Sequence, residues 1–263
     1  MTSHPNAKVN IGLDVLRRRP DGYHDLESLF VPYFQLVDTL EIEESSRFSI
    51  EIYKDGELMT ASTPGGWNPL EDLTVKAYMT LKKDFQLPPV RIRLEKGIPV
   101  GAGLGGGSSD AAFALKMLDG MFDLFLPDIM LEIYAAQLGS DCPFFIYDRP
   151  MFVSGRGEVL EDFECPFLED FELRVKIPQG IMVSTKEAYS GIIPSVPEMT
   201  LREALMLPVE KWRGIVKNDF ERTVFAAHPQ LSSVKDDFYA EGAVFASMSG
   251  SGSAVYGMFP KNR

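Results

Sequence analysis

Cysteine and histidine are scarce in this chain, which has two cysteines and three histidines among its 263 residues. Cys142 and Cys165 provide neither a disulfide framework nor the ligand spacing of a zinc site, and so few cysteines are typical of a reducing compartment. The sequence also lacks a recognisable secretory or transit signal and an apolar run long enough to span a bilayer. We therefore expect a soluble, cytoplasmic protein with no membrane partner.

Positive charge is also in short supply. The chain has 26 Lys and Arg against 38 Asp and Glu, which gives a formal net charge of −12. Proteins that bind nucleic acid neutralise its phosphates with Lys and Arg, so we expect no nucleic-acid partner. An acidic protein that binds a nucleotide must gather its positive groups locally, or use backbone dipoles and a metal ion.

One glycine-rich stretch, residues 99–112, stands out from the rest of the sequence. It reads Pro-Val-Gly-Ala-Gly-Leu-Gly-Gly-Gly-Ser-Ser-Asp-Ala-Ala, between a strand pattern at 90–95 and a helical pattern at about 108–124. Ser108, Ser109 and Asp110 are typical helix-capping residues. A glycine loop that leads into a helix N-terminus offers unpaired N–H groups to a phosphate. We predict a phosphate-binding loop, with a flexible surface linker as the alternative.

Three familiar phosphate loops do not fit this stretch. Ser108, and not a lysine, follows Gly107, which excludes a Walker loop. No His-Arg-Asp or Asp-Phe-Gly sequence accompanies the loop, which excludes a protein kinase. The strand at 90–95 alternates apolar and charged residues, which indicates a sheet with one solvated face, whereas a Rossmann sheet is covered on both faces.

Strand and helix patterns continue along the chain and indicate two domains, residues 1–150 and 151–263. We expect a loop at Gly65-Gly66, a hairpin turn at Asp55-Gly56 and a capping box at Thr200–Glu203. Strands are expected at 7–15, 38–52, 144–147, 151–160 and 171–178, and on either side of a second glycine loop at 246–253. Helices are expected from about 73 to 81, 128 to 138 (ending at Gly139), 208 to 227 and 229 to 240.

A few polar residues are candidates for chemistry. Lys8 and Asn10 alternate with apolar residues and so point to one side of their strand, beside Gly12, which would leave room for a ligand. Asp141 follows a predicted helix end and is a candidate general base, with Lys8 as its cation. The alternatives are a solvated strand face for Lys8 and a simple turn for Asp141. Cys142 is better explained as a buried structural cysteine than as a nucleophile.

Five motifs together resemble the GHMP superfamily of small-molecule kinases. They occur in the order Ala7–Asn10, Asp21–His24, Pro99–Ala112, Leu138–Pro143 and Met248–Gly252, and the resemblance covers nearly the whole chain. The Asp-Gly-Tyr-His turn and the Leu-Gly-x-Asp-x-Pro-Phe stretch are similar to the members that phosphorylate a cytidine-diphosphate-linked methylerythritol in isoprenoid precursor synthesis.

The resemblance implies an α+β fold of two domains, with the active site in the cleft between them. It also implies ATP and Mg²⁺ as cofactors, with no metal ligand assigned, and a monomer or homodimer. The family usually has Asn-Leu near the adenine, where this chain has Asp72-Leu73. The residues implied for ATP are Pro99, Val100, Gly101, Ala102, Gly103, Leu104, Gly105, Gly106, Gly107, Ser108 and Ser109.

The remaining site residues are implied in the same way. Lys8 and Asp141 would be the catalytic pair. Tyr23, His24 and Phe30 would hold the cytosine, and Asn10 would contact the methylerythritol part. The residues from Thr185 to Tyr189 would line the cytidine pocket, and the loop that begins with Ser249 and Gly250 would help to close the site.

Two other functions remain open at this point. A GHMP kinase for a mevalonate-type or homoserine substrate would need no base-binding aromatic residues. A nucleotide-binding sensor on the same scaffold would be favoured by the loss of Lys8 or Asp141, and both residues are present.

Overall fold

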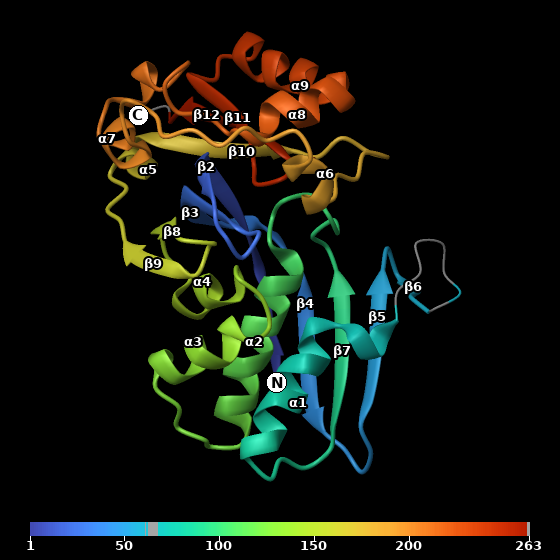
Figure 1. Cartoon of the computed structure of the whole chain (residues 1–263). Helices are drawn as coiled ribbons and strands as arrows, with labels where there is room; N and C mark the ends of the chain where they lie inside the picture. Colours follow the sequence, from blue (N-terminus) through green and yellow to red (C-terminus); the bar gives the residue numbers. More distant parts are fainter. Residues whose placement is uncertain (61, 63–67, 262–263) are drawn as a thin grey trace. The chain divides into compact units, whose positions relative to one another are not determined.

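A computed structural model describes residues 1–60, 62 and 68–261 of the chain (Figure 1). The loop predicted at Gly65-Gly66 lies outside these residues. The chain forms two compact units: unit 1 contains residues 1–7, 32–100 and 105–149, and unit 2 contains residues 8–31, 101–104 and 150–263. The chain crosses from unit 1 to unit 2 for the last time between residues 149 and 150. Residues 8–31 and 101–104, however, also belong to unit 2. The simple division into 1–150 and 151–263 stays a prediction.

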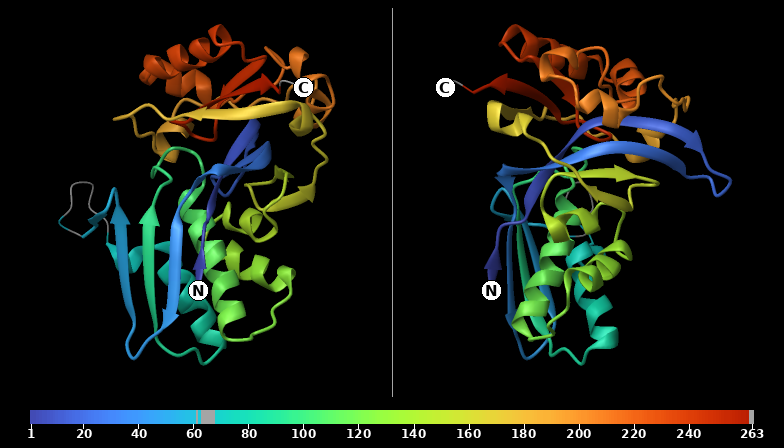
Figure 2. Two further views of the ribbon diagram at one scale, coloured as in Figure 1. Left: turned by 180° about the vertical axis from the view of Figure 1, so that it is seen from behind. Right: turned by 90° about the vertical axis from the view of Figure 1, so that its left-hand side faces the viewer.

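Unit 1 is built on a five-stranded sheet. Its strands lie in the order β1 (Thr2–Ser3), β4 (Thr39–Glu44), β7 (Val90–Lys96), β5 (Ser49–Lys54) and β6 (Glu57–Leu58). β7 is antiparallel to β4 and parallel to β5, and the predicted Asp55-Gly56 turn joins β5 to β6. Arg91 and Arg93 of β7 are exposed while their apolar neighbours are buried, as expected for a sheet with one solvated face. Helices cover the other face (Figure 2, right).

The helices of unit 1 differ from the sequence pattern in two places. They are η1 (Pro69–Glu71), α1 (Leu73–Asp84), α2 (Gly106–Met121), α3 (Asp128–Ala136) and α4 (Cys142–Tyr147). The strand predicted at 144–147 was wrong, because these residues form α4. A short apolar run buried on all sides has no periodicity that separates strand from helix, and Pro143 suits a first helical turn. α3 also ends earlier than expected, with Gln137 and not Gly139 at its C-cap.

Unit 2 contains two further sheets. One has the order β2 (Asn6–Arg18), β3 (His24–Val37), β8 (Met151–Ser154) and β9 (Val159–Asp162), with the N-terminal end of β2 and the C-terminal end of β3 in unit 1. The other has the order β10 (Phe171–Lys176), β12 (Val255–Pro260) and β11 (Phe245–Met248). Leu13 and Val15 of β2 share a buried core with residues of β11, β12 and the C-terminal helices.

The helices of unit 2 are α5 (Phe167–Asp170), α6 (Thr185–Tyr189), α7 (Leu201–Leu205), η2 (Val209–Lys211), α8 (Phe220–Ala227) and α9 (Pro229–Ala240). The predicted capping box at Thr200 is confirmed. The helix predicted over 208–227 was wrong in its middle. Residues 217–219 instead run beside β2, where the Leu13 N–H donates to Lys217 O at 2.7 Å and the Asp219 N–H to Leu13 O at 2.9 Å. In the described part of the chain, no helix is long and apolar enough to cross a membrane.

A buried ionic cluster of Lys96, Asp38 and Asp110 lies within unit 1, next to the glycine-rich loop. The Lys96 ammonium, at the end of β7, donates to carboxylate oxygens of both aspartates, and all three side chains are almost fully buried. The other Asp38 oxygen accepts from the N–H groups of Gly97 at 2.6 Å and Ile98 at 2.7 Å. Burial tends to lower the pKa of Lys96, but the two carboxylates outweigh it and raise that pKa. The cluster therefore joins the end of β7 to the first turns of α2.

Replacing Lys96 should destabilise the fold strongly. Lys96→Met removes the only cation of this cluster and leaves Asp38 and Asp110 buried without it, which should cost about 3–5 kcal/mol of unfolding free energy. Arg91→Met is the matched control on the same strand, because its ion pair with Glu43 is exposed and should contribute roughly 1 kcal/mol or less. Urea unfolding of the two variants measures the difference, and equal losses would contradict the role given to the buried cluster.

Candidate phosphate-binding and catalytic site

The glycine-rich loop enters α2 through a glycine cap. Gly105 is the N-cap residue, with φ +74°, so the predicted cap at Ser108–Asp110 was wrong. Ser109 and Asp110 are buried inside the helix instead. Because glycine has no side chain, the first N–H groups of this 16-residue helix, those of Gly106, Gly107 and Ser108, are left for a ligand or water. Together with the helix dipole, they suit a phosphate.

The first half of the loop packs against the second glycine loop, within unit 2. A Cβ on Gly103 would overlap the carbonyl oxygen of Ser249. A Cβ on Gly250 would lie 3.0 Å from Gly103 O and 3.1 Å from Asn10 Oδ1. Both glycines have positive φ, at +76° and +54°. Glycine is therefore required here by close backbone approach as well as by backbone conformation.

The Ser249 hydroxyl joins three of the predicted site segments. The hydroxyl oxygen accepts from the Asn10 N–H at 3.1 Å, and the O–H donates to Gly103 O at 3.1 Å. Beside it, the Lys8 N–H donates to Leu104 O at 2.9 Å. The structure thus brings the start of β2, residues 103–104 and the Ser249–Gly250 loop together.

Lys8 is a buried and oriented cation. Its ammonium donates to Asn10 Oδ1 and lies 4.5 Å from the centroid of the Phe30 ring. Asn10 Nδ2 in turn donates to Ser28 Oγ at 3.0 Å. Both faces of this part of β2 are buried, so the alternative of a solvated strand face is excluded.

The space expected beside Gly12 is filled. A Cβ on Gly12 would overlap Leu201 Cδ1 and lie 3.1 Å from Val216 Cγ1. The expectation of room for a ligand at this glycine was therefore wrong. The glycine is needed because its φ of +70° lies in the left-handed region and because α7 packs against it.

The predicted residues of the cytosine site have three different surroundings within unit 2. The His24 ring stacks on Tyr189, at the end of α6, with ring centroids 4.9 Å apart and an interplanar angle of 23°. Tyr23 is exposed, and the Arg156 guanidinium lies 4.9 Å from its ring centroid. Phe30 is buried beneath Lys8 instead. Burial and the charge of Arg18 lower the pKa of His24, which favours the neutral imidazole.

Asp141 lies in unit 1 at the N-cap position of α4. Its carboxylate is partly exposed, does not cap the helix, and accepts from Ser140 Oγ at 3.4 Å. The adjacent Cys142 is fully buried, which raises the pKa of its thiol to about 12. The expectation of a buried cysteine at this position is confirmed, and burial disfavours the thiolate that a nucleophile requires.

Asp72, where the family usually has Asn, has a structural task. Its Oδ1 accepts from the Thr74 N–H at 2.9 Å and from Thr74 Oγ1 at 2.6 Å, and so caps α1. Asn caps helices about as well as Asp, so the departure is compatible with the same local fold.

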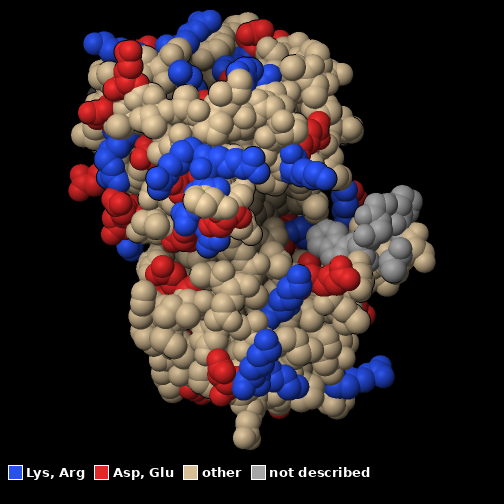
Figure 3. Space-filling view, in the orientation of Figure 1, with Lys and Arg blue, Asp and Glu red and all other residues tan. Residues whose placement is uncertain are grey.

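Two buried polar residues beside these loops were not predicted from the sequence, Lys96 and Asn218. A charged residue at the very end of a strand, directly before a glycine loop, could have pointed to Lys96. Asn218 lies in the segment that was assigned to a helix by mistake, which concealed it. On the face drawn in Figure 3, Lys and Arg gather in local groups among acidic side chains, which suits an acidic chain that binds an anion.

Comparison with known proteins identifies two family models in the chain. Residues 72–149 match the model described as "GHMP kinases N terminal domain", and residues 203–263 match "GHMP kinases C terminal". Similar proteins cover nearly the whole chain. A protein of Bacteroides thetaiotaomicron named 4-diphosphocytidyl-2-C-methyl-D-erythritol kinase is 48% identical over 259 residues, which are 98% of this chain and 92% of the relative. A protein of Cytophaga hutchinsonii with the same name is 40% identical over 265 residues, with the same coverage.

The solved structures that resemble this chain also include kinases. A crystal structure of a 4-(cytidine 5'-diphospho)-2C-methyl-D-erythritol kinase is 34% identical, with a TM-score of 0.78, and the match covers 98% of this chain and 90% of that one. The mevalonate kinase of Methanococcus jannaschii has a TM-score of 0.64 at 14% identity, over 98% of this chain and 90% of that one. The second likeness concerns the fold alone.

A side chain at Gly103 should weaken nucleotide binding. Gly103→Ala strains a positive φ and forces the first glycine loop away from Ser249, so ATP affinity should fall roughly tenfold or more. Gly120→Ala is the control. Gly120 lies within α2, and an added Cβ would come no closer than 3.9 Å to its nearest neighbour, Met1 Cε, so this variant should bind ATP normally. Calorimetric titration with ATP measures both. Unchanged affinity in a folded Gly103→Ala variant would contradict the role of the loop.

Proposed function

The chain belongs to the GHMP kinase family, and from this premise we propose that it phosphorylates the 2-hydroxyl of 4-diphosphocytidyl-2-C-methyl-D-erythritol with ATP. The product would be an intermediate of the non-mevalonate route to isoprenoid precursors. Relatives of this name at 40–48% identity over nearly the whole chain support the proposal. The single structural observation that carries it is the stacked pair of His24 and Tyr189, because a nucleobase needs an aromatic platform with hydrogen-bonding groups.

Lys8 and Asp141 are the proposed catalytic pair. The substrate hydroxyl passes its proton to the Asp141 carboxylate as its oxygen attacks the γ-phosphorus of ATP. The bond from that phosphorus to the bridging oxygen breaks, and ADP leaves with the electron pair. The Lys8 ammonium, already oriented by Asn10 and Phe30, holds the reacting hydroxyl and offsets the developing negative charge.

The phosphates of ATP are proposed to bind to backbone N–H groups of residues 101–109. The first turn of α2 supplies such donors, and the close packing of Gly103 against Ser249 fixes the loop that precedes it. Among the described residues, no group of three or more His, Cys, Asp or Glu could hold a metal ion. ATP is proposed to enter as its Mg²⁺ complex, because Mg²⁺ in nucleotide sites commonly takes most of its ligands from phosphate oxygens and water.

The function is tested by phosphate transfer from ATP to each of three acceptors. The cytidylated methylerythritol should be phosphorylated, whereas mevalonate and homoserine should not. Asp141→Asn keeps the shape of the side chain but cannot accept the proton, so kcat should fall on the order of 10²–10⁴-fold in a folded protein. Transfer to mevalonate or homoserine instead would replace the proposed substrate. Near wild-type kcat in Asp141→Asn would remove Asp141 from the mechanism.

Substitutions of the aromatic residues should separate binding from turnover. His24→Ala and Tyr23→Ala should raise the KM of the cytidylated substrate about ten- to a hundredfold, because a lost stacking ring costs about 1–3 kcal/mol. The KM of ATP should stay the same. Phe30→Ala should also lower kcat, since Phe30 supports Lys8. If steady-state kinetics leave the substrate KM unchanged in all three variants, the cytidine site lies elsewhere.

A further inference from the structure

Asn218 is a buried amide in the segment that runs beside β2. Its side chain lies in unit 2 and is almost fully buried, and both its amide nitrogen and its amide oxygen form hydrogen bonds. Nδ2 donates to Met248 O and to Gly250 O, both at 2.8 Å, and Oδ1 accepts from the Phe220 N–H at 3.0 Å. The segment itself is anchored on both sides, at Lys217 and Asp219, by the backbone of Leu13.

The two carbonyl groups that Asn218 holds belong to the residues on either side of Ser249. Ser249 is the residue whose hydroxyl contacts both the Asn10 N–H and Gly103 O. One amide group therefore fixes the backbone around this hydroxyl from both directions. Since Asn10 also accepts from the Lys8 ammonium, the path from Asn218 to Lys8 passes through hydrogen bonds, the backbone and side chain of Ser249, and Asn10 of β2.

We propose that Asn218 is a positioning residue for phosphoryl transfer. By fixing Met248 and Gly250, it sets the place of the Ser249 hydroxyl, and through it the spacing between Asn10 on β2 and Gly103 in the phosphate loop. This inference rests on the proposed kinase function, because it assigns the reacting end of the substrate to Lys8 and Asn10 and the ATP phosphates to the glycine loop.

The chemistry of the site requires an amide at this position. Asparagine offers two N–H donors and one acceptor, which match two carbonyl groups and one backbone N–H. Aspartate has the same shape and keeps the acceptor, but it places a carboxylate oxygen against two carbonyl oxygens. Asn218→Asp therefore reverses the interaction with the Ser249 loop without removing volume from the core.

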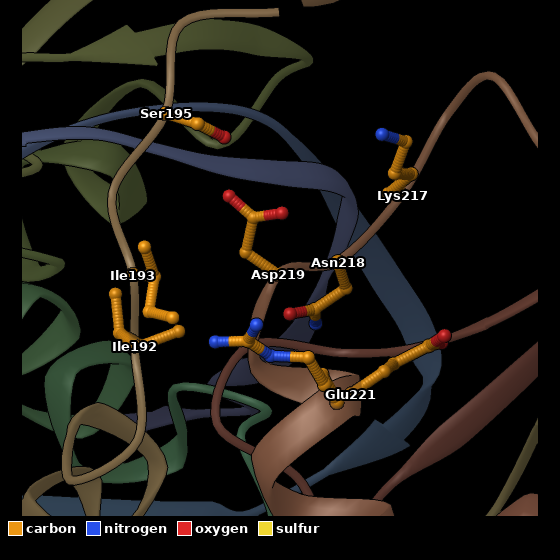
Figure 4. Close-up of a pocket in the computed structure, with 8 residues that line it drawn as sticks. Ile192, Ile193, Ser195, Lys217, Asn218, Asp219 and Glu221 are labelled. Carbon is orange, nitrogen blue, oxygen red and sulfur yellow. The ribbon is translucent and has the colours of Figure 1, made fainter.

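The neighbouring Asp219 provides a matched control. Figure 4 shows the side chains of Asn218 and Asp219 leaving the backbone in different directions, along a pocket of about 330 Å³. The Asp219 carboxylate accepts from the Val15 N–H at 2.8 Å, and the amide oxygen of Asp219→Asn can do the same. Asp219→Asn replaces a carboxylate by an amide of the same shape in the same segment, which is the reverse of Asn218→Asp. It does not alter the hydrogen bonds from Asn218 to the Ser249 loop.

The experiment compares Asn218→Asp, Ser249→Ala and the double variant in steady-state kinetics. A small misplacement of reacting groups can cost about a hundredfold, so Asn218→Asp should lower kcat roughly ten- to a hundredfold. The KM of the cytidylated substrate should change about threefold or less, because His24 and Tyr189 are not disturbed. The double variant should be no slower than the slower single variant, since Asn218 acts through Ser249. Asp219→Asn should retain wild-type kcat.

Hydrogen exchange gives a readout that does not depend on catalysis. Peptides that cover residues 245–255 and 101–104 should exchange faster in Asn218→Asp than in wild type or Asp219→Asn. If wild type transfers no phosphate but the exchange result holds, the proposed function fails and the coupling of the loops stands. Wild-type kcat per folded enzyme in Asn218→Asp, or additive losses in the double variant, would overturn the positioning role. Should Asn218→Asp not fold, Asn218→Ser, which keeps one donor, is judged by the same criteria.

Discussion

A run of five glycines between residues 101 and 107 keeps one conformation only through the groups that hold it, because glycine loses more backbone entropy on ordering than any other residue. In unit 1, the Lys96, Asp38 and Asp110 cluster ties the strand before the loop to the helix after it. In unit 2, Ser249 and the backbone of Lys8 hold residues 103 and 104. The loop can therefore combine the backbone freedom that phosphate binding requires with a fixed position. Its order is supplied by the side chains of Lys96, Asp38, Asp110 and Ser249 and by the backbone N–H of Lys8.

The acidic character of the chain makes this use of backbone groups understandable. With a net charge of −12, the negative field of the whole molecule would weaken the attraction between exposed Lys and Arg side chains and an anionic ligand. N–H groups at a helix N-terminus bind an anion without adding a titratable charge. The two buried lysines then have separate tasks. Lys96 is paired with two carboxylates and serves the fold, whereas the Lys8 ammonium contacts an amide oxygen and an aromatic ring.

The sequence predicted the family, the α+β class and most elements, because periodic patterns and glycine motifs are local properties. The amphipathic β7, the helix α9 and the capping box at Thr200 could all be recognised in this way. The errors arose where tertiary contacts decide. α4 is apolar on every side, and residues 217–219 leave the helical pattern to pair with Leu13. Burial of Lys8 against Phe30, and of Asn218 against the Ser249 loop, depends on residues that are distant in sequence. No local pattern encodes such contacts.

One hairpin of unit 2 carries both the residues proposed to recognise the base and residues proposed to take part in the chemistry. β2 carries Lys8 and Asn10, and the neighbouring β3 carries His24 at its start and Phe30 beneath the Lys8 ammonium. Phe30 lies six positions after His24 on β3, which is about 20 Å in an extended strand at roughly 3.3 Å per residue. A substrate with a nucleobase at one end and a reacting hydroxyl at the other would thus lie along a single rigid element. The distance between the binding contacts and the reacting group would then be set by strand register, which a hydrogen-bonded sheet fixes to the residue.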